Sequence, residues 1–212
     1  MSTHHAPARG LASLRRFVEK SPAIEVCELC AAHLAEQHQH LVDPQGHRIL
    51  CACDACAILF SGEGQTQYRR VPRDIWRLDD FQMDDALWSS LMIPIRLVFF
   101  YNSSASGQTV ALYPSPAGAT ESAIDAELWE EIIELNPALR SMRPDVEGLL
   151  VNRAQQEREY YLAPVDECYR LTGLIRKHWS GFSGGNEAWE AIAAYFATLR
   201  QRSLPMPLEA HA

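Results

Sequence analysis

Four cysteines in two C-x-x-C pairs are the residues of this chain best suited to chemistry. Cys27 and Cys30 form the first pair, Cys53 and Cys56 form the second, and 22 residues lie between the pairs. A C-x-x-C segment lets two sulfurs face one ion, and the spacer is long enough for a hairpin to bring the pairs together. The spacing therefore predicts a tetrahedral four-thiolate metal site. Such a closed shell leaves no position for a substrate, so we expect the site to stabilise a small structural module.

Alternative ligands lie close to this shell. Cys51 precedes the second pair by two residues, and His38 and His40 lie among the four histidines of the spacer. We expect Cys51 to lie on the strand that enters the second pair, outside the C-x-x-C turn, so these three residues are alternatives to the shell of four cysteines. A competing interpretation is that the cysteines are reduced thiols packed as small hydrophobic side chains.

Composition and charge argue against several classes of protein. The chain has 212 residues, 47% of them hydrophobic, and a formal net charge of −8, which opposes binding to nucleic-acid phosphates. No apolar run approaches the roughly 20 residues of a membrane span, and no apolar stretch follows the basic residues near the N-terminus as in a secretory signal. We therefore expect a soluble, cytoplasmic protein that binds neither nucleic acid nor membrane.

The order of elements predicts an α+β protein with a zinc-ribbon or rubredoxin-like module at its N-terminus. Residues 1–20 are expected to be a flexible N-terminus with a short helix, 21–72 the metal module, 85–203 an α+β domain and 204–212 a flexible tail. Alternating or continuous apolar runs predict antiparallel strands at 91–101, 109–113, 149–152 and 159–162. Apolar stripes at helical spacing predict three helices at 122–135, 164–179 and 186–202.

A second candidate site is the segment from residue 113 to 122, which we expect to be a rigid loop that leads into a helix. Free N–H groups at a helix start can bind an anion or the carbonyls of a partner, although a plain connection is the simpler interpretation. The candidate partner or anion residues are Pro114, Ser115, Gly118, Thr120 and Glu121.

Catalytic signatures are not visible in the sequence. Cys168 and His178 are predicted near opposite ends of one helix, without a third group to orient them. Asp145 and Glu147 are two nearby acids in an acidic protein, which is weak support for acid–base catalysis. We therefore do not expect an enzyme.

The order of these motifs resembles that of a poorly characterised bacterial family whose genes accompany [NiFe]-hydrogenase genes. The resemblance spans about residues 17 to 202 and rests on the segments 27–30, 38–41, 51–56, 113–122, 145–147 and 179–185. Residues 88–99 and 113–118 are also distantly similar to hydrogenase assembly chaperones that carry a rubredoxin-like domain. Rubredoxin knuckles usually place glycine where this chain has Ala31 and Ala57, and favour proline where it has Asp54.

The resemblance implies an accessory or assembly role for a hydrogenase, with a hydrogenase subunit or maturation factor as the protein partner. The departures from the rubredoxin pattern favour zinc over iron. The sequence thus predicts a non-enzymatic zinc-binding accessory protein. A rubredoxin-like iron electron carrier is one alternative, and an enzyme with an anion site at residues 114–121 is the other.

Overall fold

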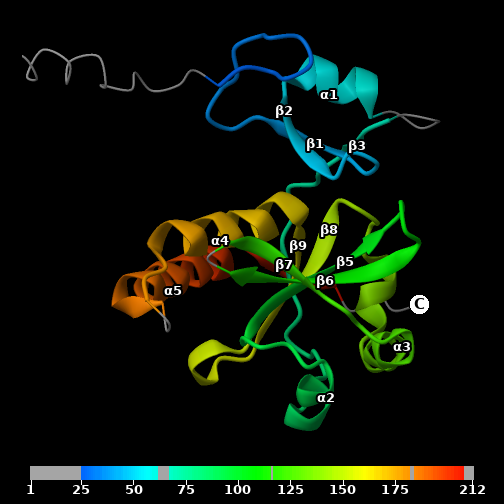
Figure 1. The fold of residues 1–212 in the computed structure, drawn as a ribbon. Coiled ribbons are helices and arrows are strands. Elements are labelled where there is room, and N and C mark those ends of the chain that lie inside the picture. The colour runs from blue at the N-terminus through cyan, green and yellow to red at the C-terminus, as the bar shows by residue number, and fades with distance from the viewer. Residues whose placement is uncertain (1–24, 62–66, 116, 182–183, 208–212) are drawn as a thin grey trace, which may run out of the picture.

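The computed structural model describes residues 25–61, 67–115, 117–181 and 184–207, which form two antiparallel sheets with helices (Figure 1). The small sheet has the strand order β2-β1-β3 and belongs to the N-terminal module at the top of Figure 1. The large sheet has the order β10-β4-β9-β8-β5-β6-β7 and forms the core of the domain below it. The predicted α+β class, with a four-cysteine cluster near the N-terminus, is confirmed.

The N-terminal module is built on a hairpin of β1 (Gln39–Asp43) and β2 (Arg48–Ala52). The turn that joins them begins at Pro44, where proline, glutamine and glycine predicted it. Strand β3 (Arg69–Arg70) pairs with the other edge of β1. Helix α1 (Asp54–Phe60) follows β2 almost directly, and this helix was not predicted.

The two faces of the hairpin have different neighbours, because successive side chains of a strand point to opposite faces. Leu41 and Leu50 are opposite each other in register and pack in the cluster that contains the buried Cys27 and Cys56. On the other face, Val42 packs in a small apolar cluster with Val71, which follows β3, and with Val146 and Val165 of the large domain. The hairpin therefore joins the cysteine cluster to the larger domain.

The large sheet is antiparallel as predicted, apart from the parallel pair of β10 and β4 at one edge. Its strands are β4 (Trp76–Arg77), β5 (Leu97–Ser103), β6 (Gln108–Ser115), β7 (Gly118–Ser122), β8 (Glu147–Asn152), β9 (Glu159–Pro164) and β10 (Leu204–Pro205). The predicted hairpin across residues 149–162 is confirmed as β8 and β9.

Helices cover both faces of this sheet (Figure 1). They are α2 (Asp85–Ser90), α3 (Ala126–Leu135), α4 (Val165–His178) and α5 (Gly185–Arg202), with short 3-10 helices at Pro137–Ser141 and Ala154–Gln156. On one face Phe99 packs with Ile175 of α4 and Phe196 of α5. On the other face Phe100 stacks on Trp129 of α3, with 5.1 Å between ring centroids.

Arg153 is a charged side chain inside this core, with no exposed surface. Its guanidinium donates to the carbonyl oxygen of Met83 at 2.7 Å and to the hydroxyl of Tyr160 at 3.3 Å, and it pairs with Asp85. It also lies over the ring of Trp88, 5.2 Å from the centroid. Arg153 thus connects the end of β8 to β9 and to α2, through Asp85 and Trp88 of the helix and the carbonyl of Met83 just before it.

The boundaries of the domain differ from those predicted. Strand β4 joins the large sheet at residue 76, before the expected start at 85, and β10 lies within the expected tail after residue 203. Both are two-residue strands, too short to give a sequence pattern. The first large strand begins at Leu97, not at residue 91. The short helix expected before residue 20 lies outside the described residues.

The segment 113–122 is a β-hairpin, which corrects the prediction of a loop leading into a helix. Tyr113 to Ser115 end β6, and residues 118–122 form β7, with Pro114 opposite Ala119 and Thr120 opposite Tyr113. Helix α3 begins at Ala126, where the Asp125 carboxylate accepts from the N–H groups of the first turn. The five candidate residues therefore lie on an edge hairpin and not at a helix start, so the expected anion site has no structural basis.

Candidate metal centre

The first cysteine pair forms a tight knuckle in the backbone. The N–H of Ala31 donates to the carbonyl of Cys27 at 2.7 Å, and the N–H of Cys27 donates to the carbonyl of Ala32 at 2.8 Å. Ala31 has a φ of 60°, in the left-handed region that normally favours glycine. The backbone therefore forms the knuckle even though alanine, and not glycine, occupies this position.

The knuckle is attached to the hairpin through Glu28. Its backbone N–H donates to the carbonyl of Cys51 at 2.9 Å, and its carboxylate accepts from the N–H of Cys51 at 2.8 Å. These two bonds hold the first cysteine pair beside the end of β2, from which the second pair follows after Ala52.

The second cysteine pair lies at the start of α1 and not in a second knuckle. Cys53 is the residue that caps the helix, and its sulfur accepts a hydrogen bond from the N–H of Cys56 at 3.5 Å. Asp54, next in the chain, accepts from the side-chain amide of Gln39 on β1 at 2.9 Å, which fixes the first turn against the hairpin.

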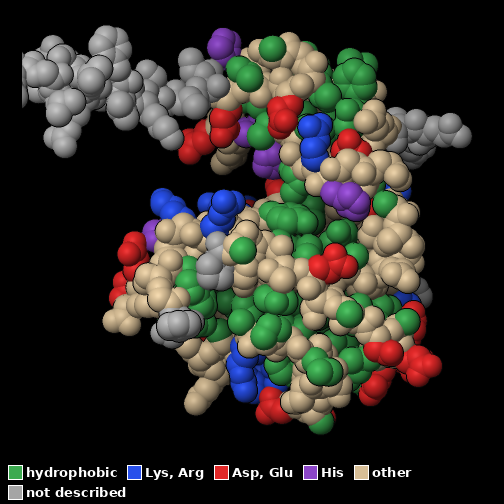
Figure 2. All heavy atoms as spheres, viewed as in Figure 1, with side chains coloured by type: hydrophobic (Ala, Val, Ile, Leu, Met, Phe, Trp, Pro, Cys, Tyr) green, Lys and Arg blue, Asp and Glu red, His purple; other side chains and the backbone are tan. Residues whose placement is uncertain are grey.

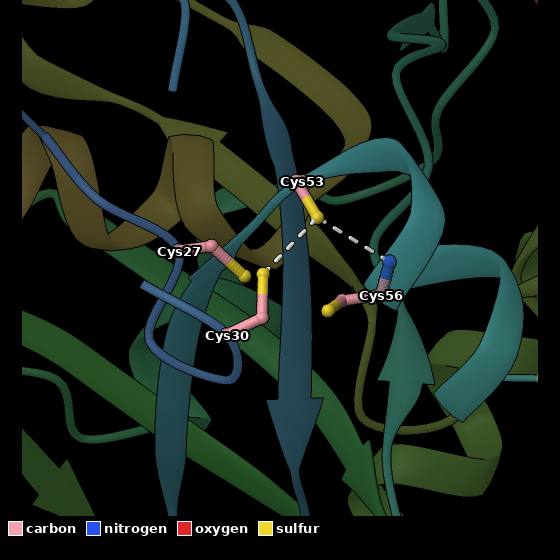
Figure 3. Close-up of side chains that lie close together, drawn as sticks. All are labelled: Cys27, Cys30, Cys53 and Cys56. Carbon is pink, nitrogen blue, oxygen red and sulfur yellow. Dashed lines mark hydrogen bonds between the residues drawn. The ribbon is translucent and has the colours of Figure 1, made fainter. Parts of the chain in front are cut away.

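The four sulfurs converge on one point (Figure 3). All lie within 4.8 Å of one another, and the sulfurs of Cys30 and Cys53 are 3.7 Å apart. A tetrahedral zinc ion with bonds of about 2.3 Å places its sulfurs roughly 3.8 Å apart, close to this distance. All six cysteines of the chain are free thiols, so no disulfide competes for these sulfurs. The cluster of Cys27, Cys30, Cys53 and Cys56 can therefore bind a metal ion.

The thiols of the cluster differ in their pKa values. Burial raises the pKa of the Cys27 thiol, but hydrogen bonds from the backbone of Cys53, Leu29 and Cys30 outweigh it and lower this pKa to about 6. Burial, followed by interactions with the other cysteines, raises the pKa of Cys56 to about 12. The Cys27 thiolate thus forms readily, whereas the Cys56 thiol resists ionisation. A divalent cation offsets the mutual repulsion that four thiolates would have.

Metal affinity is expected to fall as the pH decreases, since protons compete with the metal for the thiolates. The raised pKa of Cys56 means that this thiol must lose its proton to the solution when a metal binds. Each such proton weakens binding by about tenfold per pH unit. Competition with a chelator between pH 8 and pH 6 measures the slope. An affinity independent of pH over this range would contradict thiolate ligation.

The three alternative ligands, Cys51, His38 and His40, do not lie in this cluster. His40 and Cys51 are opposite each other on β1 and β2, on the face that does not carry Leu41 and Leu50. With His38 they form a separate cluster on that face. The period-2 alternation of the strand accounts for the separation, because Cys51 is one residue from Ala52 on the buried face. Sequence reasoning named these residues but not their common site.

The fold and the cluster define an α+β protein with an N-terminal four-cysteine module that can bind a metal ion. The chain belongs to the family of unknown function DUF5947, whose model matches residues 26–203. The match includes both cysteine pairs and every strand of the large sheet except β10. No curated protein and no solved structure matches the chain. Within the described residues, no helix has the length and apolar character needed to cross a membrane.

Proposed function

We propose that this protein is a non-enzymatic, zinc-binding accessory or assembly protein of the cytoplasm, and that its partner is a [NiFe]-hydrogenase subunit or maturation factor. The observation that carries the proposal is the convergence of four sulfurs from a knuckle and a helix start. Four protein ligands close the coordination shell, as in structural zinc sites. The order of motifs resembles the hydrogenase-associated family, and this resemblance supplies the partner. Free thiols suit a reducing compartment.

Zinc is favoured over iron because the two cysteine pairs have different backbone structures. Ala31 adopts the glycine-like conformation, so its identity does not distinguish the first pair from a rubredoxin knuckle. Ala57, in contrast, lies inside α1, and the second pair begins a helix. A pair of matched knuckles, as expected for a rubredoxin-like electron carrier, is therefore not formed. This supports a structural zinc ion.

The side chains of the large domain that were considered as catalytic acids, bases or nucleophiles are either buried or paired with other side chains. Cys168 is fully buried, and burial raises the pKa of its thiol well above the usual value. His178, ten residues further along α4, contacts Glu187 of α5 at 2.9 Å. Asp145 pairs with Arg69 at 3.1 Å, and Glu147 pairs with Arg143 at 2.7 Å. These contacts support a binding protein rather than an enzyme.

Two surfaces are available to a partner. Helix α1 exposes three consecutive apolar side chains, with Ile58 68%, Leu59 72% and Phe60 45% exposed, and Figure 2 shows hydrophobic side chains over this helix. Exposed apolar residues that lie together commonly mark protein interfaces. The second surface is β7, an edge strand that carries Thr120 and Glu121 and could accept an extended segment. We place the partner on α1. The alternative is the edge of β7, which contains Gly118, Thr120 and Glu121 of the candidate partner residues predicted from the sequence.

Affinity purification from the native host, under conditions in which hydrogenase is expressed, tests this proposal. We expect a hydrogenase subunit or maturation factor to co-purify, and Leu59→Glu to reduce its recovery by about tenfold or more, as a charge replaces a central apolar contact. Met92→Glu is the matched control, because Met92 is 86% exposed and lies after α2 in the other part of the molecule. Glu121→Arg tests the edge of β7.

Two results together would end the assembly proposal. They are a purification that recovers no hydrogenase subunit or maturation factor, and unchanged hydrogenase activity after deletion of the gene. Loss of recovery with Glu121→Arg, and not with Leu59→Glu, would move the contact from α1 to β7.

A further inference from the structure

A second group of metal-binding side chains lies on the face of the hairpin opposite the four cysteines. The ligand atoms of His38, His40 and Cys51 lie within 4.8 Å of one another. His40 and Cys51 are directly opposite in the antiparallel register, and His38 precedes His40 by two residues, so all three share one face. Figure 2 shows histidine side chains beside the hollow between the module and the domain.

His38 is oriented as a metal ligand would be. Its Nδ1 lies 3.0 Å from the carbonyl oxygen of Ala35, and since a carbonyl only accepts, Nδ1 carries the proton. In the neutral ring Nε2 then has a free lone pair. This Nε2 is buried without a hydrogen-bond partner among the described residues, and the side chain is only 8% exposed. A buried, unpartnered nitrogen is costly unless something binds it.

His40 is oriented by a carboxylate from the large domain. Its Nδ1 lies 2.6 Å from Oδ2 of Asp166, in the first turn of α4. The other oxygen of Asp166 accepts from the N–H of Glu167 at 2.9 Å, which holds the carboxylate in place. A histidine that ligates a metal commonly donates its other ring N–H to a carboxylate, as His40 can to Asp166. The pair thus leaves Nε2 of His40 to act as a ligand.

We propose that Nε2 of His38, Nε2 of His40 and the sulfur of Cys51 bind a second divalent transition-metal ion. Imidazole and thiolate ligands together suit borderline ions such as Zn²⁺, Co²⁺ and Ni²⁺. Three protein ligands leave a coordination position for water or another ligand, in contrast to the closed four-cysteine shell. The ion would exchange more readily than that of the closed shell. Through Asp166 it would also connect the module to α4.

A cysteine, a histidine and an aspartate in this order also resemble a thiol catalytic triad. That arrangement would use Cys51, His40 and Asp166, but it gives no role to His38. The buried Nε2 of His38 belongs to the same cluster and is explained by a metal ion. The metal site is therefore the interpretation that accounts for all the residues.

The test uses the full-length protein saturated with Zn²⁺ and then exposed to a chromophoric chelator. We expect a fast phase of one ion per chain from the three-ligand site and a slow phase from the four cysteines. His38→Ala, His40→Ala and Cys51→Ser are each expected to remove only the fast phase. Asp166→Asn should keep the fast ion but weaken its binding by about 10- to 100-fold. His33→Ala and Cys168→Ala are matched controls, since His33 is exposed in the same module and Cys168 is buried in α4.

Alkylation of Cys51 gives a second readout, and its comparison with and without metal needs only the native protein. We expect the second ion to protect Cys51 from iodoacetamide in the native protein, with protection lost after the fast phase of chelation. A wild-type protein with no fast-exchanging ion, or variants that all keep it, would overturn the proposal. So would alkylation at a rate independent of metal and slowed by His40→Ala, which would instead identify a catalytic thiol. None of these outcomes depends on a hydrogenase partner.

Discussion

Replacing Cys27 and Cys56 together by serine is expected to abolish binding at the four-cysteine cluster and to unfold the N-terminal module. The two buried sulfurs come from different segments, the knuckle and α1, so their loss leaves neither pair complete. Apparent zinc binding in such sites contributes about 10–16 kcal/mol at neutral pH, more than a module of this size can replace by apolar packing. Elemental analysis measures the metal, and hydrogen exchange of the β1 and β2 amides measures the folding.

The large domain is expected to remain folded in this variant, because its core clusters contain none of the four cysteines. Cys168→Ala provides the control for the loss of a buried thiol and should retain both the metal and the exchange protection. Wild-type metal content in the double variant would show that the shell is wrongly assigned. Loss of metal with unchanged protection of β1 and β2 would show that the ion is not structural.

The second large effect is expected for Arg153→Ala, which should destabilise the large domain by about 3–5 kcal/mol. The change leaves a cavity in a fully buried position and removes the donors that Met83 and Tyr160 accept from. It also removes the contact with Trp88 that holds α2. For a chain of this length we expect the melting temperature to fall by on the order of 10 °C. Thermal and denaturant unfolding measure the change.

Arg158→Ala is the matched control for Arg153. Arg158 binds the same carboxylate, Asp85, at 3.0 Å, but its side chain is 41% exposed. Exposed ion pairs contribute about 0–1 kcal/mol, so this variant should be nearly as stable as the wild type. Equal destabilisation by the two substitutions would mean that the ion pair with Asp85, and not the burial of Arg153, is the important interaction.

The parts of the fold that sequence reasoning predicted well have strong local patterns. The turn after Asp43 has proline and glycine between two short apolar runs, and the expected strand that carries Cys51 into the second pair is β2. Helices α4 and α5 have apolar stripes over 14 and 18 residues, which is long enough for a helical period to be clear. The four-cysteine cluster was predicted because spacing alone specifies it.

Short elements and distant contacts were not predictable in the same way. Helix α1 has seven residues and begins at a cysteine, so the apolar run after Asp54 resembled a buried segment more than a helix. Pro114 indicated a loop, yet it lies in β6 beyond Leu112, the last β6 residue in register with β5, where a missing N–H breaks no bond on that side. Asp166 lies 126 residues after His40, and only the fold brings these two side chains together.

Elemental analysis of the natively purified protein, combined with its absorption spectrum, tests the central claim most directly. We expect at least one tightly held zinc ion per chain and a colourless protein, because four thiolates from the knuckle and α1 can form a closed structural shell. A red protein with thiolate-to-iron absorption would instead indicate an electron carrier. A folded protein purified without any metal would contradict the assignment of the cluster as a metal centre.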